Sequence, residues 1–82
     1  MSRARSVGIL IFDEVEVLDF CGPFEVFSVA ASRSAEEVKP FQVFTIGRTR
    51  DAIRTRGGMS VTPHTSIGEV AKLDILLVPG GQ

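Results

Sequence analysis

The chain has 82 residues, a net charge of −1 and a hydrophobic content of 44%. This length allows one small domain, and this hydrophobic content argues against an intrinsically disordered chain. A net charge this close to zero gives no electrostatic footprint for direct nucleic-acid binding. The single cysteine excludes an internal disulfide and a cysteine-based metal cluster, and it favours a reducing cytoplasm as the location.

Residues 1–6 are expected to form a disordered tail, and residues 7–82 the folded part. The apolar run at residues 7–12 is too short for a signal sequence or a membrane span. Because this run is continuous rather than alternating, it predicts a strand covered on both faces, as in a parallel sheet. An acidic turn is expected after it, over residues 13–16.

A helix is predicted next, because apolar residues recur at spacings of three and four, at Val17, Phe20, Phe24, Phe27 and Ala31. Pro23 lies inside this pattern, so it either occupies the first helical turn or kinks the helix. A loop is expected over residues 32–39, and residues 41–46 predict a second strand. Strand, helix and strand in this order predict a right-handed βαβ unit.

Two short alternating runs, residues 53–56 and 59–62, flank a pair of glycines and predict a β-hairpin. Four arginines lie in and before this hairpin, at Arg48, Arg50, Arg54 and Arg56. We expect a solvated, charged hairpin face here, since such a face also discourages aggregation through the strand edge.

The last part of the chain contains another strand pattern. Ser66 is positioned to cap a short helical turn through Ala71, with Glu69 completing a capping box. The apolar run at residues 74–78 then predicts a second buried parallel strand, and it leads directly into residues 79–81, Pro-Gly-Gly. This turn is either purely structural or a place where glycine N–H groups meet a ligand, because ligands of parallel sheets bind beyond the carboxyl ends of the strands.

Asp19 has two interpretations, because it follows the first strand and opens the helix. It is either an N-cap that accepts backbone N–H bonds, or a carboxylate that points into the crevice and exchanges a proton with a nucleophile or a water. Cys21 lacks the strand–nucleophile–helix elbow of an activated nucleophile, and the one histidine, His64, lies beyond the hairpin. We therefore interpret Cys21 as a small buried hydrophobic residue of the helix.

Several segments, taken together and in order, resemble the ThiJ/PfpI family. They are residues 7–13, the Leu-Asp-x-x-Gly-Pro-x-Glu-Val-Phe pattern of residues 18–27, and residues 44–47, 57–63 and 74–81. The pattern at residues 18–27 is similar to the branch that contains isonitrile hydratase and the ligand-sensing domains of AraC-type transcription regulators. The resemblance implies a class I glutamine-amidotransferase-like fold, usually homodimeric. This is an α/β, flavodoxin-like three-layer sandwich with a parallel sheet plus a β-hairpin, here incomplete at the C-terminus.

The resemblance also implies roles for single residues. Asp19 matches the acidic residue that faces the family's catalytic cysteine, as an acid/base or orienting carboxylate. Gly80 and Gly81 match glycines whose backbone lines the same oxyanion pocket. The family's cysteine lies in an elbow downstream of the Pro-Gly-Gly turn and has no counterpart here, and Cys21 does not match it. No cofactor and no metal are expected.

The sequence thus predicts the N-terminal segment of a ThiJ/PfpI-like domain, inactive by itself. The complete protein would resemble isonitrile hydratase, with lyase- or hydrolase-type chemistry at a C–N bond by a downstream cysteine. The alternatives are a truncated ligand-sensing domain of an AraC-type regulator and, third, a standalone interaction module. The expected partners are a small-molecule substrate or ligand and a second copy of the chain, with no membrane and no nucleic acid bound by this segment.

Overall fold

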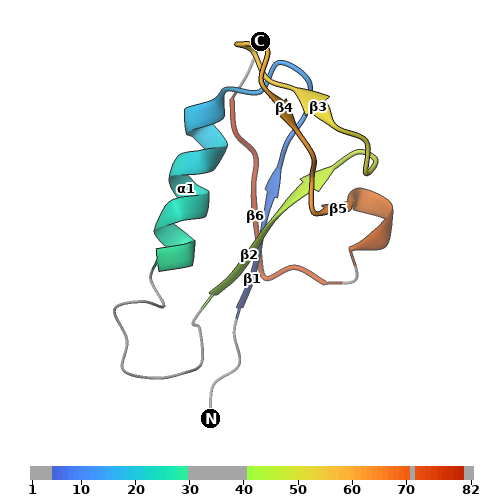
Figure 1. Ribbon diagram of the computed structural model, residues 1–82. Coiled ribbons are helices and arrows are strands. Elements are labelled where there is room, and N and C mark those ends of the chain that lie inside the picture. Colours follow the sequence, from blue (N-terminus) through green and yellow to red (C-terminus); the bar gives the residue numbers. More distant parts are fainter. Residues whose placement is uncertain (1–4, 30–40, 71, 81–82) are drawn as a thin grey trace.

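The computed structural model describes residues 5–29, 41–70 and 72–80. It contains a parallel four-stranded sheet of order β5-β2-β1-β6, a helix packed along this sheet, and a separate hairpin, β3-β4, at the end where β1 stops (Figure 1). The elements are β1 (Arg5–Leu10), α1 (Val17–Val29), β2 (Phe41–Gly47), β3 (Ile53–Arg54), β4 (Ser60–Val61), β5 (Thr65–Ser66), the 3-10 helix η2 (Ile67–Glu69) and β6 (Ile75–Leu77). The predicted α/β class, with a parallel sheet and a hairpin, is confirmed.

β1 lies at the centre of the sheet, between β2 and β6, as its apolar composition predicts. Val7 and Ile9 are fully buried on one face. Gly8 is buried on the other face, where an added Cβ would overlap the side chain of Ile46. The strand begins at Arg5, so the expected tail is too long by two residues, and residues 1–4 lie outside the described residues.

α1 packs its phenylalanines on the sheet, as the spacing predicts, although Ala31 lies outside the described residues. Phe20 is buried in the core, and Phe24 packs against the same core cluster. Phe27 meets Phe41 of β2 edge-on, with 4.9 Å between the ring centroids. This face of the helix fixes α1 on the sheet through aromatic contacts.

Pro23 lies in the middle of α1 rather than in its first turn. Proline has no N–H, so the carbonyl of Asp19 loses its usual partner one turn later, and the exposed position of Asp19 lets water replace it. The residue before a proline normally avoids the helical conformation because its Cβ meets the proline ring. Gly22 has no Cβ, so the helix continues through Pro23.

The segment around Ser66 differs from its prediction. Ser66 makes no cap to the backbone, and its hydroxyl donates to Glu69 Oε1 at 2.9 Å. The segment forms β5 and the single turn η2 rather than a helix through residue 71, which lies outside the described residues. Glu69 Oε1 also accepts a bond from Arg50 Nε at 2.6 Å, so one carboxylate joins η2 to the loop after β2.

β6 is parallel, as predicted, but it is less buried than its composition suggests. Leu76 is 53% and Val78 65% exposed. β6 is an edge strand of the described sheet, and it pairs only with β1. The second face of this strand therefore stays exposed within the described residues.

Acid is expected to weaken the contact between η2 and the loop after β2. The hydrogen bond from Arg50, and then that from Ser66, hold the pKa of Glu69 below its ordinary value of 4.5. A carboxyl group whose pKa is lower in the folded than in the unfolded state stabilises the fold when the pH is above the unfolded-state pKa. This stabilisation is lost as the pH falls through the folded-state pKa. Urea unfolding should therefore separate Glu69→Gln from the wild type at about pH 7 and bring them together at about pH 3. A difference that stays constant over this range would contradict the assignment.

Gly47 is expected to tolerate no side chain. A Cβ at Gly47 would lie 2.6 Å from the carbonyl oxygen of Thr49 and 2.7 Å from Pro63 Cγ, so the backbone itself would have to shift. Gly47→Ala should lower the free energy of unfolding by about 1–3 kcal/mol. The matched control is Gly57→Ala, since no atom lies within 4 Å of a Cβ at Gly57. Equal unfolding midpoints for the two variants would refute this explanation.

Candidate functional site

The loop between β1 and α1 is held in place by the hairpin. The Glu14 N–H donates to the Arg54 carbonyl at 2.8 Å, and the Arg56 N–H donates to the Val15 carbonyl at 3.1 Å. The Arg54 N–H in turn donates to Asp13 Oδ1 at 3.0 Å. The loop thus pairs with β3 and the residues after it almost as a neighbouring strand would. We call this contact the loop–hairpin clasp.

Glu14 has an unusual backbone conformation at the turn of this loop. Its φ is 73°, in the left-handed region that residues other than glycine rarely adopt. The turn is closed by the Val15 N–H, which donates to the Phe12 carbonyl at 3.0 Å, and Val15 is completely buried. Within this turn the chain leaves β1 and reaches the start of α1.

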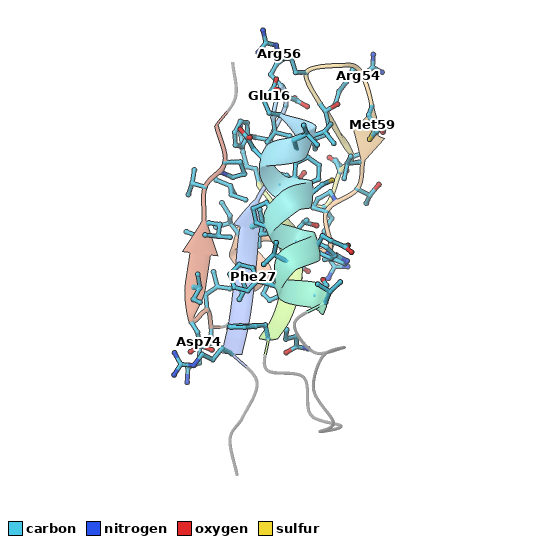
Figure 2. The ribbon with its side chains drawn as sticks, turned by 90° about the vertical axis from the view of Figure 1, so that its left-hand side faces the viewer. Glu16, Phe27, Arg54, Arg56, Met59 and Asp74 are labelled. Carbon is cyan, nitrogen blue, oxygen red and sulfur yellow. The ribbon has the colours of Figure 1, made fainter. Side chains whose placement is uncertain are left out.

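Glu16 connects the clasp to the segment after β6. Its carboxylate accepts a bond from Arg56 Nη1 at 3.2 Å, with both side chains about half exposed. Figure 2 shows Glu16 and Arg56 together at the hairpin end of the molecule, with Asp74 at the opposite end. The Glu16 N–H also points to the Gly80 carbonyl, at 3.5 Å. An exposed ion pair adds little stability, so its main effect is to orient the hairpin relative to the loop before α1.

Two of the predicted site residues meet next to Glu16. Asp19 lies in the first turn of α1, and its Oδ2 is 3.3 Å from the position that a Cβ of Gly80 would occupy. They lie near the carboxyl ends of β1 and β6, and β2 and β6 flank β1 on opposite sides. Such a point of reversed strand order is where open α/β sheets bind ligands. Gly81, the third predicted residue, lies outside the described residues.

Asp19 is not the N-cap of α1. The helix begins at Val17, and the Asp19 N–H already donates to the Glu16 carbonyl at 3.1 Å. The side chain of Asp19 is exposed, and no described residue donates a hydrogen bond to its carboxylate. The helix N-terminus favours a negative charge in this turn. The carboxylate is therefore accessible, and it accepts no hydrogen bond within the described part of the chain.

Cys21 is exposed on α1, so its interpretation as a buried residue is wrong. The expectation that Cys21 is not an activated nucleophile stays a prediction. Across residues 5–29, 41–70 and 72–80, no three acidic, histidine or cysteine side chains converge as metal ligands. None of the helices in these ranges is long and apolar enough to cross a membrane.

Two arginines of the hairpin region form ion pairs, whereas the sequence predicted only a solvated, charged face. Arg56 pairs with Glu16, and Arg50 pairs with Glu69, although all four side chains stay partly exposed. The complementary charges of the acidic turn and the basic hairpin were a signal in the sequence for the first pair. What it could not show is that residues 40 positions apart would meet.

The described residues thus form an α/β domain with a parallel sheet and an accessible carboxylate at the switch point of that sheet. The chain belongs to the DJ-1/PfpI family, whose model matches residues 5–82. It is 27% identical over 78 residues to the isonitrile hydratase of Pseudomonas putida, which covers 95% of this chain and 31% of that protein. It is 33% identical over 75 residues to a Streptomyces lividans protein from the cpoL 5′ region, covering 92% of this chain and 50% of that one.

The fold is also that of a solved transcriptional regulator. An AraC-family regulator from Pseudomonas putida superposes with a TM-score of 0.77 at 20% identity, over 95% of this chain and 48% of that one. This likeness shows the fold alone. The chain spans between about a third and a half of the length of the curated relatives it matches.

Two aspartates near this site are expected to respond differently to substitution. Asp13→Ala removes the acceptor of the Arg54 N–H and should cost about 1–2 kcal/mol of unfolding free energy. Asp19→Ala removes only a favourable charge at the helix N-terminus and should cost less than about 1 kcal/mol. Urea unfolding of both variants measures the difference. A larger loss for Asp19→Ala would return the carboxylate to a structural role.

Proposed function

We propose that this chain forms one wall of a small-molecule pocket in a ThiJ/PfpI-type domain, with chemistry related to that of isonitrile hydratase. The observation that carries the proposal is the meeting of Asp19 Oδ2 with Gly80 at the switch point of the sheet. The sequence identity to an isonitrile hydratase supports the choice of substrate class.

In this proposal the chain supplies the carboxylate and the backbone of the pocket, and a cysteine encoded after residue 82 supplies the nucleophile. Hydration of an isonitrile adds water at its terminal carbon and gives an N-substituted formamide. The added atoms include protons on carbon and nitrogen, so a group that takes up and returns a proton is needed. Asp19 fills this role because its carboxylate is accessible, and Gly80 lets the backbone approach the reacting group. Gly81 is assigned to the same pocket by family resemblance alone.

The second candidate is a ligand-sensing domain of an AraC-type regulator. The likeness in fold to such a regulator favours it. The same pocket would then bind a small molecule without turning it over, and DNA binding would belong to a separate helix-turn-helix domain. A second copy of the protein as partner, and a cytoplasmic location, are part of both proposals, on the grounds of family resemblance and the single cysteine.

Reading the gene beyond codon 82 is the first experiment. The enzyme requires a strand–turn–helix elbow with a cysteine, and the regulator requires a helix-turn-helix. An open reading frame that encodes neither would refute both proposals and favour a standalone interaction module.

The second experiment measures hydration of an alkyl isonitrile by the complete gene product. Asp19→Asn should lower turnover at least about 100-fold, the typical contribution of a positioned acid or base, while the free energy of unfolding falls by less than about 1 kcal/mol. Asp51→Asn is the matched control, because Asp51 is an exposed acid in the loop before the hairpin and should leave turnover unchanged. Full activity of Asp19→Asn would exclude Asp19 as the acid or base.

The chain of residues 1–82 should show no isonitrile turnover by itself, since an exposed helix cysteine without a base is not an activated nucleophile. The formamide product can be followed by chromatography. Turnover that disappears in Cys21→Ser would identify Cys21 as a nucleophile and contradict this prediction.

A further inference from the structure

His64 pairs with Thr45 of β2 in the manner of a neighbouring strand. The His64 N–H donates to the Thr45 carbonyl at 3.1 Å and to Thr45 Oγ1 at 3.0 Å. In return, the Thr45 N–H donates to Nδ1 of the imidazole ring at 2.9 Å, and Thr45 Oγ1 lies 3.1 Å from the same nitrogen. β5 pairs with β2 only at Ile46 and Gly47, so this side chain completes the edge of β2 one residue further along.

This geometry fixes the protonation of the ring. A backbone N–H can only donate, so Nδ1 must offer its lone pair, and the neutral imidazole carries its proton on Nε2. A second proton would have to go to Nδ1, where it would face the Thr45 N–H and would have Thr45 Oγ1, 3.1 Å away, as its acceptor. The hydrogen bond would then be lost at a residue that is only 6% exposed, and an unpaired amide there is costly.

The same ring also contacts the helix that carries Asp19. It stacks on Phe24 of α1 with 5.9 Å between the centroids and 10° between the planes. Phe24 packs against the core cluster around Ile9 and Phe20. His64 therefore joins the edge of β2 to α1.

No neighbouring charge takes over the role of the Thr45 bond. β2 carries no charged residue, α1 carries Glu25 beside Phe24, and Glu69 and Lys72 line a cavity of about 490 Å³ together with His64. Within the described ranges none of these three forms an ion pair with His64, and Glu69 is paired with Arg50.

We propose that His64 is a proton-operated latch: the neutral ring accepts the Thr45 N–H, closes the edge of β2 and ties it to α1, and the protonated ring releases this backbone N–H. A proton on Nδ1 and the bond from the Thr45 N–H exclude one another, so the protonation of the ring decides whether this bond exists. This inference does not depend on the proposed enzymatic or sensing role.

The test follows the Thr45 amide, and it is simple because His64 is the single histidine of the chain. Hydrogen exchange of the ¹⁵N-labelled protein, corrected for the intrinsic effect of pH, is measured with His64 neutral and with His64 protonated. The Thr45 amide should lose about fivefold in protection on protonation, the change expected for one hydrogen bond of average strength. The ring nitrogen shifts should show an unprotonated Nδ1 before the titration.

Two variants separate the latch from general acid destabilisation. His64→Asn keeps an acceptor oxygen near the position of Nδ1 but does not titrate, so its Thr45 protection should stay constant. Thr45→Val removes Oγ1 but keeps the backbone N–H, so the pH response should remain. The proposal is overturned by an unprotected Thr45 amide in the neutral state, by an unchanged protection on protonation, or by an equal loss in His64→Asn.

Discussion

The loop–hairpin clasp is the interaction on which the rest of this structure depends. The loop from β1 to α1 contains a residue in a left-handed conformation and would not keep its shape by local preferences alone. Backbone bonds from Glu14 to Arg54 and from Arg56 to Val15 hold it against the hairpin. Because α1 begins directly after this loop, the clasp sets the position of the first helical turn and of the carboxylate of Asp19.

The clasp also explains why similar side chains have different tasks here. Asp13 and Asp19 are both acidic and both close to the end of β1, yet Asp13 accepts the Arg54 N–H and Asp19 accepts no described bond. A carboxylate that satisfies a backbone amide is committed to the fold, whereas one without a partner is free to meet a ligand. The neighbourhood, rather than the residue type, separates the structural aspartate from the candidate functional one.

Local patterns were sufficient to predict β1, α1, β2 and the hairpin, because their periodicity and glycines determine short-range structure. Family resemblance placed Asp19 and Gly80 in one pocket, and the geometry brings them together. Exposure was harder to predict. Cys21 lies on the outer face of α1, and the outer face of β6 is open, since burial depends on which element packs where.

Contacts between distant residues could not be predicted. Ser66 has the sequence of a helix cap, but its hydroxyl donates to a carboxylate that Arg50 also holds. The bond between Thr45 and His64 likewise gave no local signal, because it depends on how β2 and the segment after the hairpin are aligned. In each case a tertiary partner decided between several local options that the residue type allowed.

The connection between β1 and β6 has a consequence for the order in which the molecule assembles. The Ser6 N–H donates to Asp74 Oδ2 across a sequence separation of 68 residues, whereas β1, α1 and β2 are consecutive along the chain. Contacts of long sequence separation carry a large loop-closure entropy and form slowly. The βαβ unit can therefore fold early, and Asp19 and Gly80 come together only after β6 has docked. A ligand that contacts both residues would bind only after the sheet is complete. It would therefore stabilise the state in which β6 is docked.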